Sequence, residues 1–157
     1  MPPSARWVKV NVDATYDSVL HYGGLGVAVR DSLGCLVGGC CVRVDFVHSP
    51  LMVEALAARL ACQFTMQYHM SPVLFESDYL KVVKDVQSNV YGTLITDTQS
   101  LLSICPGSRF VHVHREANIW AHKLAKRALL SSLDICWYGN TPTNISNCVT
   151  RTCMISS

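Results

Sequence analysis

The sequence predicts one α/β domain built on a five-stranded mixed sheet flanked by helices. Two observations support this fold class. Three strand-like runs with short connections precede the first helical segment, and short apolar runs then alternate with helical segments as far as residue 130. Short connections produce antiparallel strands, whereas a strand, a helix and a further strand form a parallel crossover. At 157 residues the chain suits a single domain.

The first three strands are expected at residues 7–13, 27–31 and 35–45. The first reads WVKVNVD, in which apolar and polar side chains alternate as they do in a half-buried strand. This pattern places Asp13 at the end of the first strand. A glycine-rich stretch precedes the second strand, and a turn containing Gly34 precedes the third, which is rich in Val.

From residue 49 the pattern becomes helical. Ser49 is a good N-cap, Pro50 suits the first helical turn, and apolar residues within 51–70 recur at steps of three and four. The remaining elements are expected as strand 72–76, helices 79–88 and 94–105, strand 109–114 and helix 117–130.

The helical and strand periodicity fades after residue 130 into Ser, Thr, Asn and Cys. We therefore expect an N-terminal extension over 1–6, the folded domain over 7–130 and a loosely packed C-terminal tail over 131–157.

Composition favours a compact globular protein over a disordered one, because 50% of the residues are apolar and 15% are charged. The net charge of +2 is too small to identify a polyanionic partner. No C-x-x-C pair occurs among the eight cysteines, so buried free thiols are expected. No apolar run of 18 residues and no signal core is present, so we expect a soluble intracellular protein without a membrane segment.

Three acidic residues lie beside core sequence: Asp13, Glu54 and Asp78. Carboxylates are hard ligands for Mg²⁺ or Mn²⁺, and several at one point repel each other unless a cation is present. Taken singly, each has another explanation. Asp78 can be an N-cap, Asp13 a turn residue, and Glu54 a first-turn acid that complements the helix dipole.

The order of several motifs resembles the type 1 ribonuclease H family. The similarity is greatest to the branch found in plant genomes alongside non-long-terminal-repeat retroelements, which suggests a retrotransposon-derived chain. It covers about residues 7–130. The motifs are VNVD at 10–13, GGLGVAVRD at 23–31, EALA at 54–57, ESD at 76–78 and HVHREAN at 112–118.

The resemblance implies a ribonuclease H-like fold and a metal-dependent endonuclease that hydrolyses the RNA strand of an RNA–DNA hybrid with two divalent ions, Mg²⁺ or Mn²⁺. By position, Asp13, Glu54 and Asp78 match the first three catalytic carboxylates and metal ligands of the family. The fourth carboxylate is expected four residues after Asn118, where this chain has His122.

His122 divides two hypotheses. An imidazole ligates Mn²⁺ better than Mg²⁺, so one hypothesis is an enzyme of reduced activity that prefers Mn²⁺, with His122 as a catalytic and metal-binding residue. The alternative is a catalytically silent nucleic-acid-binding module in which His122 is a surface histidine. His112 matches the family's mobile histidine, which assists product release or proton transfer, although it can equally be a structural residue of its strand.

Several further residues are candidates for binding nucleic acid, in a chain expected to act as a monomer. Glycines permit close approach to a shallow minor groove, although a tight strand entry also explains them, and arginines can contact phosphates. A related fold with different chemistry, such as a 3′–5′ exonuclease or a transposase core, is a third possibility. The candidates are Gly23, Gly24, Gly26, Arg30, Arg115 and Asn118.

Overall fold

The computed structural model describes residues 7–87, 93–105, 107–131 and 133–146. The expected N-terminal extension, 1–6, and the last part of the expected tail, 147–157, lie outside the described residues.

Six strands form one mixed sheet in the order β5-β4-β1-β2-β3-β6. The pairs β1/β2, β2/β3 and β3/β6 are antiparallel, whereas β1/β4 and β4/β5 are parallel. The fold class is therefore confirmed, with one strand more than predicted. The strands are β1 (Val8–Asp17), β2 (Tyr22–Arg30), β3 (Leu36–Asp45), β4 (Val73–Ser77), β5 (Arg109–His112) and β6 (Ile135–Tyr138).

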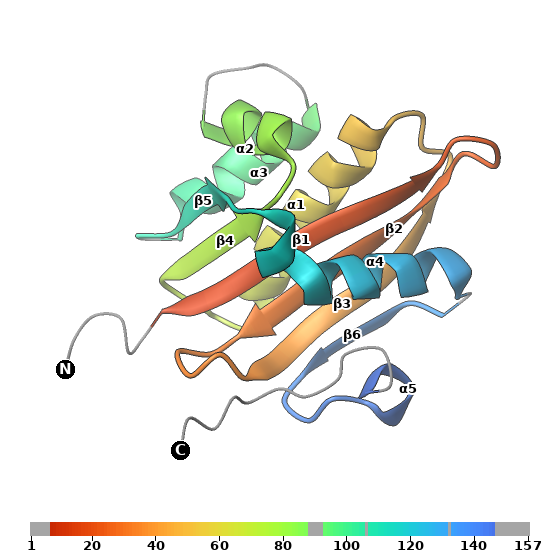
Figure 1. The fold of residues 1–157 in the computed structure, drawn as a ribbon. Coiled ribbons are helices and arrows are strands. Elements are labelled where there is room, and N and C mark those ends of the chain that lie inside the picture. The colour runs from red at the N-terminus through yellow and green to blue at the C-terminus, as the bar shows by residue number, and fades with distance from the viewer. Residues whose placement is uncertain (1–6, 88–92, 106, 132, 147–157) are drawn as a thin grey trace.

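Helices cover both faces of the sheet, with α1 on one face and α4 on the other (Figure 1). The N-cap predicted at Ser49 is present, because its hydroxyl accepts a hydrogen bond from the backbone N–H of Met52 at 3.0 Å. Among the described residues, no helix is long and apolar enough to cross a membrane. The helices are α1 (Pro50–Gln67), α2 (Leu80–Gln87), α3 (Thr93–Ser103), the 3-10 helix η2 (Arg115–Asn118), α4 (Ile119–Leu130) and α5 (Thr143–Ser146).

The sixth strand falls in the segment that the sequence predicts to be a loose tail. Strand β6 pairs with β3, Trp137 is buried against α4, and Ile145 is fully buried in the same cluster. The prediction of loose packing is therefore wrong for residues 135–146. A strand of four residues between polar neighbours gives too short an alternation to recognise.

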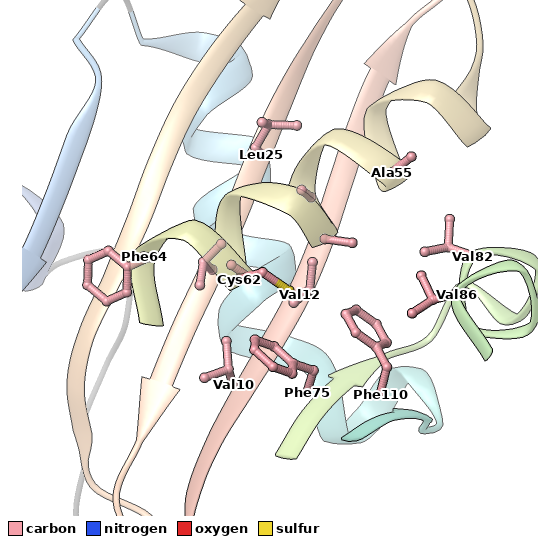
Figure 2. Close-up of a cluster of buried hydrophobic side chains, with 14 of the residues drawn as sticks. Val10, Val12, Leu25, Ala55, Cys62, Phe64, Phe75, Val82, Val86 and Phe110 are labelled. Carbon is pink, nitrogen blue, oxygen red and sulfur yellow. The ribbon is translucent and has the colours of Figure 1, made fainter. Parts of the chain in front are cut away.

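The larger core lies between the sheet and helices α1, α2 and α3. Figure 2 shows Val10 and Val12 of β1 directed toward α1, and the rings of Phe75 and Phe110 side by side. Those two rings stack at 5.4 Å between centroids. Because Val10 and Val12 fill this face, Asn11 and Asp13 lie on the opposite face of β1.

Strand β1 continues past the predicted end at Asp13. Pairing with β2 extends to Asp17, opposite Tyr22, so Asp13 lies in the middle of the strand. The strand beside it ends sooner, because β4 pairs with β1 only as far as Ser77, opposite Val12. Asp13 is thus the first residue of β1 beyond the end of β4.

The glycines of β2 bring helices close to the sheet and do not form an open surface. A Cβ added at Gly24 would lie 2.0 Å from the carbonyl oxygen of Ala125, and one at Gly26 would lie 2.1 Å from that of Ala121. A Cβ at Gly23 would lie 2.6 Å from Val53 of α1. All three glycines are buried. The prediction that they contact nucleic acid is therefore wrong, since helices occupy the space.

The prediction of buried free thiols is confirmed for Cys40, Cys62 and Cys105, and Cys41 is likewise buried and not disulfide-bonded. It is wrong for two others among the described residues. Cys136 is free but exposed on strand β6, and Cys35 is disulfide-bonded. The spacing of cysteines along the chain does not reveal which distant pairs meet in space.

Candidate active site

Asp13 lies at the centre of the candidate site. Its side chain is buried, with 4% of the residue exposed, and it faces α4. Nδ1 of His122, on α4, lies 2.7 Å from Oδ2 of Asp13. This contact is an ion pair when the imidazole is protonated and a hydrogen bond when it is neutral and carries its proton on Nδ1.

Glu54 reaches the site from the first turns of α1. It is 6% exposed, and its side chain shares a hydrogen bond with the Asp13 carboxyl. Its Oε2 is buried and has no hydrogen-bond partner among the described residues. A buried carboxylate oxygen without a partner is costly, so this atom is suited to accept a ligand that the protein alone does not supply.

Asp78 follows the last residue of β4 and lies near Asp13 because β4 ends beside Val12. Two side chains from η2 hold it. The amide Nδ2 of Asn118 donates to Oδ1 of Asp78 at 3.4 Å, and Nε of Arg115 lies 3.7 Å from its Oδ2. The sequence prediction that Asp78 is part of an acidic group is consistent with this placement. In the turn before α2, the hydroxyl of Ser77 accepts a hydrogen bond from the N–H of Tyr79 at 3.1 Å.

Burial and mutual repulsion shift the titration of this group. Burial raises the pKa of Asp13, and the negative charge of Asp78 raises it further, while the His122 contact acts in the opposite direction. Burial also raises the pKa of Glu54 to about 9, assisted by the charges of Asp13 and Asp78. Without a cation, therefore, Glu54 retains its proton at neutral pH.

The histidines occupy different places. His122 makes direct contact with Asp13, as the sequence-level hypothesis of a site residue requires. His112 is exposed at the end of β5, opposite Ser77 in the parallel ladder, and therefore beside the strand end that carries Asp78. Its ring lies 6.2 Å from that of His114.

Asn118 was predicted to bind nucleic acid, but it is a buried structural residue. Only 1% of it is exposed, and its Nδ2 donates to the carbonyl oxygen of Val12 at 2.8 Å. Its Oδ1 accepts from Nδ2 of Asn11 at 3.0 Å. Asn118 therefore connects η2 to β1 and Asp78, and burial excludes direct contact with a polymer.

A second polar group, which the sequence did not single out, surrounds Asn11. Nδ2 of Asn11 donates to Oε1 of Glu76 at 3.2 Å, and Arg30 donates to Oδ1 of Asn11 at 3.0 Å and to Oε1 of Glu76 at 3.1 Å. Asn11 precedes Asp13 by two residues and Glu76 precedes Asp78 by two, so strand alternation places each on the face of its acid. This alternation is the sequence pattern from which the position of Asn11 and Glu76 beside the acidic group could have been predicted.

The two candidate arginines differ in setting. The side chain of Arg115 is 77% exposed and lies beside Asp78, where it can contact a ligand. Arg30 is bound to Glu76 and Asn11 and lies on the α4 face, toward the start of β1.

The donor set suits a hard divalent ion, although the side chains are not arranged around one. Within the part of the chain that the structure describes, no group of three or more His, Cys, Asp or Glu side chains has the geometry to hold a metal ion as it stands. The unpartnered Oε2 of Glu54 and the raised pKa values of Glu54 and Asp13, which burial and neighbouring negative charge cause, are nevertheless what a buried acidic group without a balancing positive charge produces. Oxygen donors of this kind fit Mg²⁺ or Mn²⁺.

The sheet order, with acidic residues meeting where β4 ends beside β1, defines a ribonuclease H-like domain. A family model described as reverse transcriptase-like matches residues 11–128. This range is well over half of the chain, so the protein belongs to that reverse transcriptase-like family, and its domain is a ribonuclease H family domain. A search of curated proteins found no match in sequence.

Solved structures share the fold at low identity. RNase H1 from the halophilic archaeon Halobacterium salinarum has a TM-score of 0.72 at 17% identity, with 78% of this chain and 97% of that one covered. LC11-RNase H1 from compost, in complex with an RNA/DNA hybrid, has a TM-score of 0.67 at 21% identity, with 79% of this chain and 99% of that one covered. The foamy viral protease-reverse transcriptase, in complex with dsDNA, has a TM-score of 0.60 at 19% identity, with 82% of this chain and 97% of that one covered. These similarities establish the fold.

Proposed function

We propose that this chain is a divalent-metal-dependent endonuclease that hydrolyses the RNA strand of RNA–DNA hybrids, with reduced activity because His122 replaces a carboxylate. The observation that carries the proposal is the convergence of Asp13, Glu54 and Asp78. They come from a strand, a helix and the end of another strand, and burial together with neighbouring negative charge raises the pKa of Asp13 and that of Glu54. Family membership and the fold make nucleic-acid hydrolysis the chemistry to test first.

Asp13, Glu54 and Asp78 would hold the metal, of which the family leads us to expect two ions. Bound divalent metal would supply Lewis-acid activation of water and stabilisation of the leaving 3′ oxygen. The chain itself would hold the carboxylates in place. Asn118 fixes Asp78 against β1, and Val12 anchors Asn118 through its carbonyl oxygen. Arg115 beside Asp78 offers a positive charge to a substrate phosphate.

His122 limits the activity in this proposal. Its Nδ1 occupies one oxygen of Asp13, so an ion must share that carboxylate with the imidazole or displace it. A neutral imidazole carries no charge to offset a divalent ion, and it ligates Mn²⁺ better than Mg²⁺. We therefore expect weak activity that Mn²⁺ supports better than Mg²⁺.

His112 is proposed to assist proton transfer or product release. It is exposed beside the strand end that carries Asp78, so it can reach a phosphate bound there without rearrangement of the core. We propose that the partner is an RNA–DNA hybrid, bound by a monomer, and that the chain derives from a plant retroelement.

The alternative proposal is a catalytically silent module that binds nucleic acid. The observation that favours it is the His122–Asp13 contact, in which the imidazole takes one oxygen of the Asp13 carboxyl without metal. In both proposals the hybrid binds at the same surface. The enzyme would cleave the hybrid, whereas the silent module would only bind it.

The test is a hybrid-cleavage assay with Mg²⁺ or Mn²⁺ on the native chain, Asp13→Asn, His122→Asp and the exposed-carboxylate control Glu116→Gln. The enzyme proposal expects measurable cleavage by the native chain, none by Asp13→Asn, a large increase in His122→Asp and no change in the control. If the native chain and His122→Asp are both inactive with either ion while hybrid binding persists, the silent module is correct.

A further inference from the structure

A groove of about 510 Å³ lies on the α4 face of the sheet, on the part that α4 leaves open. It is formed by the start of β1, the neighbouring strands and the turn between β2 and β3. Its lining residues include Trp7, Lys9, Arg30, Leu74 and Arg109. Lys9 precedes Asp13 by four residues on the same strand, which separates the groove from the acidic site by about 13 Å.

Strand register places the cations of this groove in one row across the sheet. Lys9 lies directly opposite Arg30 on β2 and beside Leu74 on β4, and Leu74 lies beside Arg109 on β5. The row therefore crosses four adjacent strands, over about 14 Å at the usual strand spacing. Like charges directly opposite in a ladder destabilise a sheet unless something neutralises them.

The protein supplies only part of that neutralisation. Arg30 is bound to Glu76. Among the described residues, Lys9 and Arg109 form no ion pair, and both are exposed. The acidic residue of the lining, Asp31, accepts hydrogen bonds from the backbone N–H groups of Leu33 and Cys35 within its own turn. Lys9 and Arg109 are therefore available to an anion.

An aromatic ring forms one wall of the groove. The guanidinium of Arg109 lies 5.8 Å from the ring centroid of Trp7. A groove with positive charge and an aromatic wall is typical of surfaces that bind single-stranded nucleic acid, because the backbone follows the charges and bases stack on rings. The row of cations from Arg30 to Arg109 is about 14 Å long, or three strand spacings. It is longer than one phosphate group, so it suits a chain of several nucleotides.

We propose that this groove binds an unpaired nucleic-acid strand through Lys9, Arg30 and Arg109, with Trp7 as a stacking wall. This site is separate from the acidic group and does not require cleavage. A strand held here would be an unpaired extension of whatever nucleic acid the chain engages elsewhere.

The test is fluorescence anisotropy with a labelled ten-nucleotide oligothymidylate, in EDTA so that the acidic site holds no metal. We expect the variant with both Lys9→Gln and Arg109→Gln to bind about tenfold more weakly than the native chain at moderate salt. Its plot of log affinity against log salt should be shallower by about 1.4, since each single-strand phosphate contact contributes about 0.7. Trp7→Leu should lower the affinity without changing that slope.

The matched control removes two exposed lysines elsewhere, Lys84→Gln with Lys126→Gln, and should bind as the native chain does. Equal losses in the two double variants would overturn the proposal, because binding would then follow overall charge. Adenosine monophosphate that competes as well as unlabelled oligothymidylate would also overturn it, because the site would then take a mononucleotide. Asp13→Asn should bind the oligonucleotide normally even if the hydrolase proposal fails.

A second inference rests on a different observation, the pairing of Cys40 and Cys136. They lie directly opposite each other on the antiparallel strands β3 and β6. Three positions along, the N–H of Gly139 donates to the carbonyl oxygen of Val37 at 2.8 Å, so Val37 and Gly139 form a hydrogen-bonded pair. Pair types alternate along a ladder, so Cys40 and Cys136 form a non-hydrogen-bonded pair, in which Cα atoms lie about 4.5 Å apart.

That separation is within the range that a disulfide spans, about 4.4–6.8 Å between Cα atoms. Both thiols are free, and they share a side-chain hydrogen bond. Cys136 is exposed, whereas Cys40 is fully buried behind it. The hydrogen bond from Cys40 lowers the pKa of Cys136, which favours the thiolate at the exposed position.

We infer that Cys136 and Cys40 form an oxidisable pair that a peroxide converts to a cross-strand disulfide. The Cys136 thiolate attacks one peroxide oxygen and becomes a sulfenic acid; the O–O bond breaks, and the other oxygen leaves as hydroxide or alkoxide and is protonated to water or an alcohol. The Cys40 sulfur then attacks the Cys136 sulfur and expels the sulfenic oxygen as water. Two thiols and one peroxide are consumed, and the peroxide is reduced.

The test is alkylation and intact-mass analysis of the full chain after hydrogen peroxide treatment. The native chain should lose two alkylatable thiols and two hydrogens, with fragmentation placing the link between Cys40 and Cys136. Its melting temperature should rise after the peroxide treatment. Cys105→Ser should behave as the native chain, and Cys136→Ser should not form the link. Retention of every free thiol, or an equal loss in Cys136→Ser, would overturn the inference.

Discussion

Replacing Glu54 by Gln in the metal-free protein should remove much of the loss of stability that the native chain shows as the pH rises. Burial raises the Glu54 pKa from an ordinary 4.5 to about 9, so the folded chain keeps a proton that the unfolded chain releases above pH 4.5. Protonation then favours the folded state at low pH, and this contribution is lost as the pH rises through 9. The raised pKa of Asp13 acts in the same direction.

The size of the effect follows from linkage. Between the two pKa values, one extra bound proton lowers the free energy of unfolding by about 1.4 kcal/mol for each pH unit. From pH 5 to pH 8 the ceiling is therefore about 4 kcal/mol for Glu54. Glutamine has the shape of protonated Glu and does not titrate, so Glu54→Gln should match the native chain at pH 5 and exceed it at pH 8.

Urea denaturation in EDTA at several pH values measures this difference. Glu116 is an exposed carboxyl outside the acidic group, so Glu116→Gln serves as the charge-matched control and should retain the native pH dependence. If Glu54→Gln loses stability between pH 5 and pH 8 as steeply as the native chain, the carboxyl of Glu54 is not the source of the pH dependence, and a proton held on buried Glu54 is refuted.

Three further outcomes are expected. Gly26→Ala should cost more than about 3 kcal/mol in urea denaturation, because its Cβ would lie 2.1 Å from the Ala121 carbonyl oxygen and the helix backbone must move. Asn118→Ala should cost about 2–4 kcal/mol by the same measurement, since the buried carbonyl of Val12 would lose its 2.8 Å partner. Mn²⁺ at ten times its dissociation constant should stabilise the native chain by about 1.4 kcal/mol, seen as a higher melting temperature that Asp13→Asn does not show.

Much of the fold could be predicted because its elements have strong local periodicity. The alternation of Val8, Val10 and Val12 with polar residues gave β1, and the cap at Ser49 gave the start of α1. The end of β1 was misplaced, since pairing with β2, and not the sequence of β1, determines how far the strand extends. Strand β6 was missed for the same reason, because its stability comes from β3 and the second core.

The site was predicted in part. The resemblance to the ribonuclease H family assigned Asp13, Glu54 and Asp78 to one site, and their electrostatic interaction in the structure is consistent with that assignment. The prediction that Asn118 contacts nucleic acid was wrong because motif position does not report burial. The partners of Asn11 lie 19 to 107 positions away in the chain, so alternation within each strand predicts the face on which they lie but not that they meet.

The glycines of β2 affect the acidic site through helix packing. Gly26 lies directly opposite Asp13 in the antiparallel ladder, and above it lies the carbonyl of Ala121, the residue before His122. A side chain at that position would push the start of α4 away from the sheet. Because Nδ1 of His122 lies 2.7 Å from Asp13, even a small displacement of α4 would lengthen the contact. The absence of a side chain at Gly26 therefore allows the imidazole of His122 to lie within hydrogen-bond distance of Asp13.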